Sequence, residues 1–368
     1  LSCMAVCIFG FTDYLGMDLL HFKVRLKTEH MDMFTSFIGN INMYTGLLSV
    51  YLGAACLLWV SCPNKLRSIW YYVNVWVIFI ALITGRSDNA YLSLAAAFTF
   101  IPIYAFRTRQ GIRRYIVLLA TFLTSLKVIE WIATTYADRV YRIDSLYNSL
   151  VSFSKLILLI KVLWIIAIIL YLIDFISKKA DATVSPWFSR IWIGLIVIGF
   201  AAFLYVLYDV NIAGNADKYG SAKSFLLFND SWGTHRGVIW RLAIEDYQDF
   251  TPIHKLFGYG PDTFGLVTYY HNMDIMTNVY HQIFDSAHNE YLQFFITVGP
   301  IGLLSYLAIF VTAFIRIIKK GCQNPYVIAA MFGVLCYSAQ ATVNIGTPIT
   351  IPIMFLFLSM ALAGCREA

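Results

Sequence analysis

Long runs of apolar residues recur along the chain, separated by short polar segments. A helix needs about 20 mostly apolar residues to cross the roughly 30 Å hydrocarbon core of a bilayer. Nine runs approach or exceed that length: 37–60, 68–84, 89–106, 115–136, 155–176, 188–208, 288–315, 326–341 and 349–364. The pattern therefore predicts an all-α, polytopic helical membrane protein.

A tenth apolar run opens the chain, from Leu1 to about Phe11, without an initiating Met. A signal-peptide remnant would carry a basic segment and a small-residue cleavage site, and neither is present. We expect instead that the chain begins inside a helix and lacks earlier spans. About ten spans would then form a single integral-membrane domain over 1–368.

Composition agrees with lipid as the solvent for most of the chain. Hydrophobic residues make up 59% and charged residues 13%, whereas an ordinary soluble domain has about 25% charged residues. A water-soluble core cannot bury this much apolar surface. The composition excludes a cytosolic enzyme, a nucleic-acid-binding domain and a disordered protein, so no nucleic-acid partner is expected.

Charge is distributed unevenly over the segments that connect the apolar runs. Lys and Arg gather on alternate connections, at 65–67, 107–114, 178–190, 316–320 and in the C-terminal tail. Because basic loops face the cytoplasm, the longest connection, 209–287, is predicted to be extracytoplasmic. All seven histidines lie in the outward segments or at their edge, so the titratable chemistry is expected on that side.

The predicted loop 209–287 is longer than a connection without a function usually is. Within it, the segment 236–249 has apolar residues at 239, 240, 243 and 247, the spacing of one helical face. We expect an amphipathic helix that lies against the outer membrane–protein boundary. The segment 260–265, GPDTFG, is typical of a turn and indicates no chemistry by itself.

A dense polar cluster stands where this loop meets the next apolar run, with Asp285, His288, Asn289 and Glu290 close together. Ionisable groups at the end of a span are costly to bury and therefore indicate a site. The near-neutral pKa of a histidine suits a general base for an alcohol. The alternative is a helix start capped by Asp285 or Ser286, with the other polar residues at the interface.

A metal site is a second alternative, since His281, Asp285 and His288 follow an i, i+4, i+7 spacing. On a continuous helix they would share a face, and their side chains suit zinc. No HExxH or DxD pattern accompanies them, and we predict neither a metal nor a cofactor.

Two arginines and three intramembrane residues complete the candidates. Arg86 lies in a short outward turn, and Arg236 begins the predicted amphipathic helix; either can bind phosphate, contact lipid headgroups or pair with a nearby aspartate. Lys127, Glu130 and Lys161 lie inside predicted spans, in the outer half. A Lys127–Glu130 pair with a snorkelling Lys161 would explain them, and so would a polar cavity.

Taken in order, five segments resemble the O-antigen ligase and O-antigen polymerase family of membrane proteins. They are FIGNINMYTGLLSVYLG (37–53), LITGRSDNAYLSL (82–94), HRGVIWRLAIED (235–246), FGYGPDTFG (257–265) and SAHNEYLQFFITVGPIGLLSYL (286–307). The resemblance extends from about residue 37 to the end of the chain. Members of the family have about twelve spans, so two would precede this sequence.

The resemblance implies an inverting, metal-independent C-type glycosyltransferase of the bacterial cytoplasmic membrane. Such an enzyme transfers a glycan from an undecaprenyl pyrophosphate carrier to an acceptor sugar hydroxyl on the outer face, in lipopolysaccharide or exopolysaccharide synthesis. By motif, the functional set falls on Arg86, Arg236 and His288: two cations for the pyrophosphate and one base for the hydroxyl. Ligase and polymerase remain open alternatives.

The other polar candidates receive supporting roles under this hypothesis. We expect Asp285, Asn289 or Glu290 to bind substrate or orient the imidazole, and Lys127 and Lys161 to line the path of the pyrophosphate. The expected partners are the carrier-linked oligosaccharide, a glycan or lipid-linked sugar acceptor, and membrane lipids.

The competing class is a polysaccharide or lipid transporter or flippase, which many spans and intramembrane charges would also suit. Such folds are built from repeated halves, and no repeat is evident in the sequence. A membrane-embedded protease or metal hydrolase would need a GxSxG or HExxH motif, which the sequence lacks.

Overall fold

The structure is a computed structural model that describes residues 1–31, 33–143, 145–177, 182–320 and 324–365. Part of the basic segment 178–190 and the end of the C-terminal tail lie outside the described residues. Regular structure in the described ranges is helical apart from one antiparallel ribbon, in which β1 (Phe34–Thr35) pairs with β2 (Gly39–Asn40). The all-α prediction is confirmed for this part of the chain.

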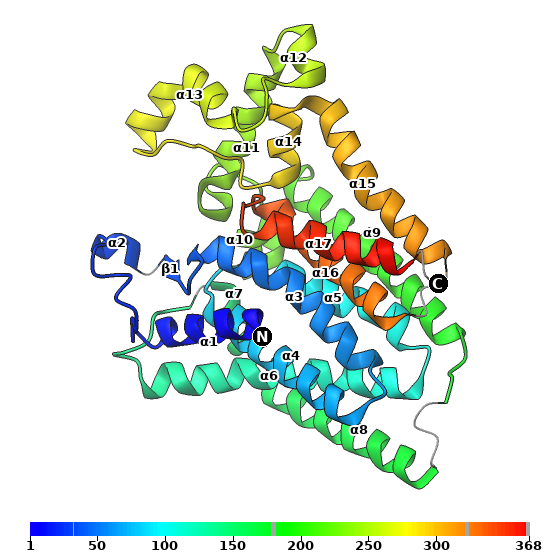
Figure 1. The fold of residues 1–368 in the computed structure, drawn as a ribbon. Coiled ribbons are helices and arrows are strands. Elements are labelled where there is room, and N and C mark those ends of the chain that lie inside the picture. The colour runs from blue at the N-terminus through cyan, green and yellow to red at the C-terminus, as the bar shows by residue number, and fades with distance from the viewer. Residues whose placement is uncertain (32, 144, 178–181, 321–323, 366–368) are drawn as a thin grey trace. The chain divides into compact units, whose positions relative to one another are not determined.

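The described chain folds as two compact units (Figure 1). Unit 1 comprises Leu1–Trp192, Phe314–Gln340 and Thr347–Ala368, and unit 2 comprises Ile193–Ala313 and Ala341–Gly346. The helices of unit 1 are α1 (Ser2–Tyr14), α2 (Thr28–Met31), α3 (Ile41–Ser61), α4 (Lys65–Thr84), α5 (Asn89–Ala105), α6 (Arg109–Thr135), α7 (Ser145–Val151), α8 (Leu156–Ser177), α16 (Pro325–Gln340) and α17 (Thr350–Gly364).

Unit 2 holds the shorter helices of the predicted loop and the segment that follows it. These are η1 (Ala216–Ala222), α10 (Lys223–Leu226), α11 (Trp232–Gln248), α12 (Pro252–Phe257), α13 (Phe264–Asp274), η2 (Ile275–Val279), α14 (Glu290–Thr297) and η3 (Ala341–Val343). Two long helices, α9 (Trp187–Asn211) and α15 (Gly299–Lys319), contribute residues to both units. The division concerns packing, and a single membrane domain over 1–368 stays a prediction.

Seven helices of the described chain are long and apolar enough to cross a membrane by length and composition. They are α3, α4, α6, α8, α9, α15 and α16 with its continuation η3. The predicted runs 89–106 and 349–364 form the shorter apolar helices α5 and α17, and the first run forms α1. The number of spans and the extracytoplasmic position of the loop therefore stay predictions.

The core of unit 1 is built on a close crossing of α3 and α16, which lie side by side in Figure 1. A Cβ added to Gly53 would lie 2.1 Å from the carbonyl oxygen of Phe332, and one added to Gly333 would lie 2.6 Å from that of Val50. Small residues let two helix backbones approach where lipid offers no hydrophobic drive for association. These two glycines therefore fix how α3 and α16 pack.

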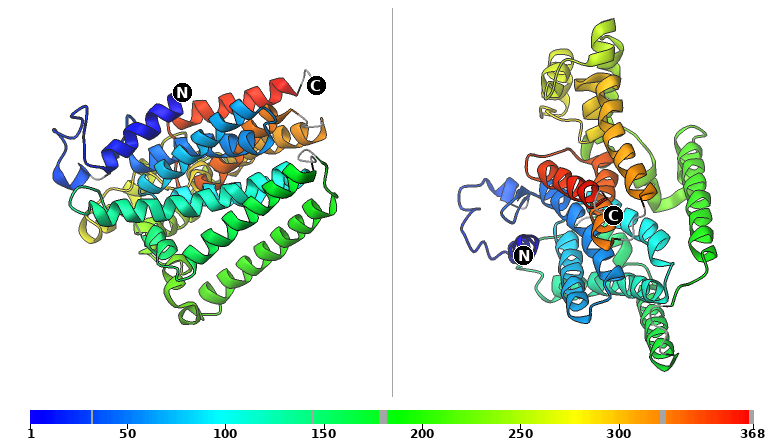
Figure 2. Two further views of the ribbon diagram at one scale, coloured as in Figure 1. Left: turned by 90° about the horizontal axis from the view of Figure 1, so that it is seen from below. Right: turned by 45° about the vertical axis from the view of Figure 1, so that its right-hand side comes forward.

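A second pair, α6 and α8, runs alongside one another in unit 1 (Figure 2). At one end Arg113 forms a buried ion pair with Asp174, and its guanidinium lies 4.1 Å from the Tyr171 ring centroid. Further along, Trp164 Nε1 donates to Thr124 Oγ1 at 3.0 Å. Polar contacts at two levels thus hold α8 against α6, although most of the apolar surface of α8 is exposed.

The core of unit 2 is smaller and gathers buried side chains from α11, α13, α14 and the segment before α14. Along α11 the buried positions are Val238, Ile239, Leu242, Ala243 and Asp246. The helix expected over 236–249 is present, but its apolar face packs on α13 and α14. Neighbouring helices of the same loop therefore cover this face, and the position of α11 at the membrane boundary stays a prediction.

Candidate active site

The polar cluster before the predicted span 288–315 ends in a capped helix start. Asn289 is the N-cap of α14, and its side-chain oxygen accepts a hydrogen bond from the Leu292 N–H at 3.1 Å. The cap satisfies one of the orphan N–H groups of the first helical turn. Asn289, rather than Asp285 or Ser286, is therefore the capping residue, and it holds the residue before it at the helix entrance.

The backbone just before His288 is fixed on both sides of Ala287. The Ala287 N–H donates to Gln293 Oε1 at 2.8 Å, and Trp240 Nε1 donates to the Ala287 carbonyl oxygen at 2.8 Å. Gln293 lies on α14 and Trp240 on α11. Two helices thus position this turn through side chains that the sequence analysis did not single out.

His288 occupies this turn with a left-handed backbone, φ 46°. A residue with a Cβ adopts that region at a cost of roughly 1–2 kcal/mol, and such strain persists where the surroundings impose it. Burial lowers the pKa of the His288 imidazole, the charge of Arg236 lowers it further, and Asp285 acts in the opposite direction. The ring is therefore neutral at physiological pH, which is the form that accepts a proton.

The His288 imidazole also keeps hydrogen-bonding capacity. Its Nδ1 is buried and has no hydrogen-bond partner among the described residues. Buried polar atoms are nearly always paired, so an exception calls for a physical reason. A neutral imidazole offers one donor and one acceptor nitrogen. A bound hydroxyl is one group that can form a hydrogen bond with such a nitrogen.

Arg236 follows three consecutive residues in left-handed backbone: Gly233, Thr234 and His235, with φ values of 59°, 58° and 69°. The next residue, Gly237, is required by close packing, since a Cβ there would lie 1.8 Å from the Asn229 carbonyl oxygen. The segment around HRG is therefore an irregular start of α11, and the charge of Arg236 in it lowers the pKa of His288. Both residues belong to unit 2.

The glycine-rich segments of unit 2 meet by backbone contact. A Cβ on Gly258 would lie 2.2 Å from the Thr297 carbonyl oxygen, and one on Gly299 would lie 2.1 Å from that of Leu256. Gly299 has φ 71° and stands at the break between α14 and α15, and Pro300 follows it in the sequence. This packing gives the segment 257–265 a structural role: it supports the helix that carries the His288 turn.

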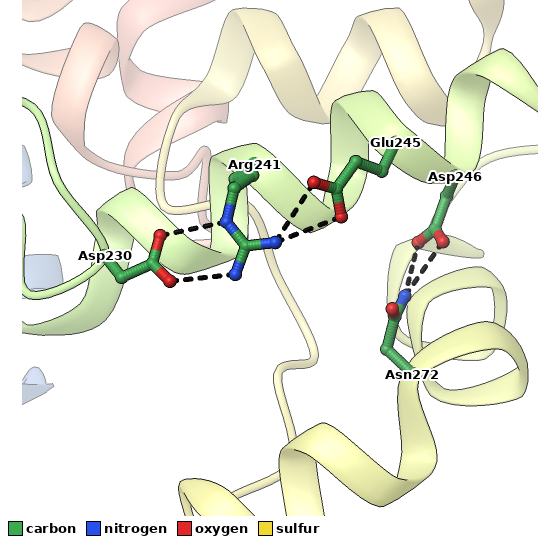
Figure 3. A network of polar contacts seen from close by, with 5 residues as sticks. All are labelled: Asp230, Arg241, Glu245, Asp246 and Asn272. Atoms are coloured by element: carbon green, nitrogen blue, oxygen red, sulfur yellow. Dashed lines mark hydrogen bonds and ion pairs between the residues drawn. The ribbon is translucent and has the colours of Figure 1, made fainter.

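Polar contacts along α11 tie it to its neighbours (Figure 3). Arg241 forms a two-pronged ion pair with Asp230, 2.8 and 2.9 Å, and also contacts Glu245 at 3.1 Å. The buried Asp246 accepts from Asn272 of α13 at 2.8 and 3.0 Å. Arg241 lowers the pKa of Asp230, so this carboxylate near the start of α11 is engaged by Arg241.

Two of the expected substrate-binding residues have structural partners. Glu290 is 2% exposed, and its carboxylate accepts a hydrogen bond from the Tyr306 hydroxyl of α15. Asn289 caps α14. Asp285 is exposed and packs beside Gly265, and its charge acts on His288. Of the three, Asp285 is the one placed to influence the imidazole.

Arg86 belongs to unit 1, where it lies in the turn between α4 and α5. It is 8% exposed, has φ 56°, and its guanidinium lies 4.7 Å from the Tyr141 ring centroid. The buried Lys23 approaches the same ring, at 4.6 Å. Neither Tyr141 nor Lys23 could be recognised in the sequence, because both are distant from the turn that holds Arg86.

The turn around Arg86 is joined to the start of α3. Ser87 Oγ donates to Asn42 Oδ1 at 2.7 Å, and Asn89 Nδ2 donates to the same oxygen at 3.2 Å. Asn40 caps α3 by accepting from the Asn42 N–H at 2.7 Å. The first two family-like segments, 37–53 and 82–94, therefore contact one another in the fold.

Three candidates from the predicted spans are brought together in unit 1. Lys127 pairs with Glu130, as one alternative predicted, and both line a cavity with Lys161. By contrast, the chain between Tyr280 and Glu290 is not helical, so the continuous face that a metal site would need is absent there. No group of three or more His, Cys, Asp or Glu side chains within the described residues could hold a metal ion.

No family model and no curated protein matches the chain. The resemblance to the O-antigen ligase and polymerase family therefore stays a prediction from motifs. Two groups of candidate residues result. In unit 2 the charge of Arg236 lowers the pKa of His288, and in unit 1 Arg86 and Lys23 approach the Tyr141 ring.

Proposed function

We propose that this protein is a glycosyltransferase of the bacterial cytoplasmic membrane that uses a lipid-linked donor on the outer face. The reaction joins a glycan carried by undecaprenyl pyrophosphate to a sugar hydroxyl, as an O-antigen ligase or polymerase does. One observation carries the proposal: an anchored turn in left-handed backbone holds a neutral imidazole, and the charge of Arg236 lowers the pKa of that imidazole. The five family-like segments support the same assignment.

His288 is the proposed general base. It accepts the proton of the acceptor hydroxyl as that oxygen bonds to the anomeric carbon, while the bond from this carbon to the pyrophosphate oxygen breaks. The bonding electrons leave on undecaprenyl pyrophosphate, and attack from the opposite face inverts the anomeric centre. A positioned base of this kind contributes about 10²–10⁴-fold in rate.

Arg236 is the proposed stabiliser of the leaving group, and for Arg86 the same role stays a prediction from its motif. A guanidinium binds phosphate oxygens through a planar fork and keeps its charge at any physiological pH. Fixed positive charge aimed at a developing anion lowers the barrier without reorganisation. No metal is required in this scheme, and Asp285 is assigned to orient the imidazole rather than to bind the sugar.

The proposal is tested in proteoliposomes supplied with an undecaprenyl-pyrophosphate-linked oligosaccharide and an acceptor glycan. We expect His288→Ala to lower transfer by about 10²–10⁴-fold. His281→Ala is the matched control, because His281 lies in the same segment with φ 51°, is exposed, and bonds through Nδ1 to the Thr277 carbonyl. Equal activities of the two variants would remove His288 as the base.

The same experiment separates the transporter alternative. A flippase would move the lipid-linked glycan across the bilayer without joining it to the acceptor. Full translocation in the absence of transfer would exclude the glycosyltransferase.

A further inference from the structure

An open-sided cavity of about 600 Å³ lies between α6 and α8 of unit 1. Its polar lining comes from Lys127 and Glu130 on α6 and Lys161 on α8, and its apolar lining includes Trp131 and Ile157. Both helices are long and apolar enough to cross a membrane. The cavity thus gathers three ionisable groups in a part of the chain where charge is expensive.

The charges in this cavity do not cancel. Glu130 forms an ion pair with Lys127, and the two side chains are 36% and 27% exposed. Lys161 is exposed on α8 and makes no ion pair within the described residues. The cavity therefore has one positive charge in excess.

A second cavity of about 380 Å³ lies further along the same pair of helices. Its lining is apolar and aromatic, with Val117 on α6 and Trp164, Tyr171 and Phe175 on α8. The hydrogen bond between Trp164 and Thr124 lies at the junction, since Thr124 lines the first cavity and Trp164 the second. Beyond it, the Arg113–Asp174 ion pair joins the two helices at their other end.

A snorkelling lysine alone does not explain this arrangement. Snorkelling places a charged head near water and requires no cavity, no second lysine and no apolar pocket in line with it. A lipid with an anionic phosphate head and a long apolar chain matches each part: the head meets the lysines, and the chain follows the apolar cavity. A single apolar cavity in line with the charged one suits a lipid with one chain better than a lipid with two acyl chains.

We propose that the two cavities together form a groove between α6 and α8 that binds the lipid carrier. Lys161 and Lys127 contact the phosphate groups of the carrier, and the apolar cavity holds its first isoprene units. The choice of a polyprenyl diphosphate over another anionic lipid rests on the proposed function. The groove is a holding site, and none of its residues takes part in the bond exchange assigned to His288.

Glu130 gives the proposal a directional test. Because its carboxylate occupies Lys127, Glu130→Gln leaves Lys127 available to the phosphate and removes a negative charge. Binding of an anionic lipid should become about three- to tenfold tighter in this variant. A purely structural Lys127–Glu130 pair would give unchanged or weaker binding instead.

The experiment uses the full chain in phosphatidylcholine nanodiscs, with undecaprenyl diphosphate titrated and the bound lipid counted by native mass spectrometry. We expect Lys161→Gln to weaken binding at least about tenfold, and Lys161→Arg to retain most of it. Lys155→Gln is the matched control, because Lys155 is exposed just before α8 and does not line the cavity. Its affinity should equal that of the unaltered protein.

Two results would overturn the inference. Equal affinities of Lys161→Gln and Lys155→Gln would show that the groove does not bind the head, and equal competition by phosphatidylglycerol would show a general anionic-lipid site. The His288→Ala variant separates this inference from the proposed function, since it should bind the carrier normally. If the unaltered protein binds the carrier through Lys161 but transfers no glycan, the lipid site is sustained and the glycosyltransferase is contradicted.

Discussion

The α3–α16 crossing of unit 1 and the His288 turn of unit 2 are each held tightly in place by their own contacts, but the kind of contact differs. At the crossing, Gly53 and Gly333 let two apolar helices touch backbone to backbone. At the turn, side-chain hydrogen bonds from Trp240 and Gln293 hold Ala287, and the next residue adopts left-handed backbone. Apolar packing supplies the rigid frame, while directional bonds hold the strained position where chemistry is proposed.

The comparison predicts the largest loss of stability at the crossing. Gly53→Leu places a side chain against the Phe332 carbonyl oxygen and Cys336 Sγ, so backbone must move. We expect a cost of about 3 kcal/mol or more, the upper range for overpacking. Gly194→Leu on α9 is the control, because a Cβ there meets nothing within 4 Å. Thermal unfolding in detergent should separate the two, and equal stability would remove the crossing as the frame.

Arg236 should affect rate and pH dependence rather than folding. Protonation inactivates His288 as a base. Because its pKa is lowered, the imidazole stays neutral at pH values below the ordinary histidine pKa of about 6.5. Arg236→Gln removes a repelling charge, so the pKa rises and the acid limb of transfer moves to higher pH. We also expect an approximately 10²-fold lower rate, the scale of one lost electrostatic contact.

Arg236→Lys provides the matched comparison for that profile. It keeps the charge, so the acid limb should stay where it is, while the loss of the planar fork lowers the rate. The measurement is kcat/KM against pH in proteoliposomes. An acid limb that does not move in Arg236→Gln would contradict the coupling between Arg236 and His288.

Trp240→Phe tests the directional anchor with a smaller change. The ring stays, and the hydrogen bond to the Ala287 carbonyl is lost, at a cost of about 1 kcal/mol. Transfer should fall because the His288 turn loosens. Trp232→Phe is the control on the same helix, since its Nε1 donates to the Phe225 carbonyl instead. If both variants lose the same activity, the anchor has no specific role.

Arg241 should have the smallest effect, although its contacts are the most conspicuous in Figure 3. Arg241 and Asp230 are 43% and 46% exposed, and exposed ion pairs are worth about 0–1 kcal/mol. Arg241→Gln should therefore lower the unfolding free energy by less than about 1 kcal/mol and leave transfer unchanged. A larger loss in a denaturation experiment would show that polar contacts, rather than the buried face of α11, hold unit 2 together.

The helices could be predicted from the sequence because apolar runs of this length encode them locally. The helix α9 (Trp187–Asn211) lies within a few residues of the predicted run 188–208, and the break at Gly299 is visible as Gly-Pro. What covers a helix depends on distant residues. The apolar spacing of 236–249 therefore predicts an amphipathic helix, but it does not report that α13 and α14 cover the apolar face.

The candidate site shows the same division between local and long-range information. Motif and charge single out His288 and Arg236, and Lys127 with Glu130 is an i, i+3 pair on one helix. The contacts of Trp240 and Tyr141, and the cavity that Lys161 lines, form only when remote segments pack together. No spacing in the sequence reports those contacts.

The most direct measurement of the central claim is the release of free undecaprenyl diphosphate by the purified protein in sealed proteoliposomes. A glycosyltransferase releases one carrier for each glycan joined to the acceptor, and His288→Ala abolishes both while His281→Ala retains both. Carrier-linked glycan that crosses the membrane with no carrier released, or release that is unchanged in His288→Ala, would contradict the account.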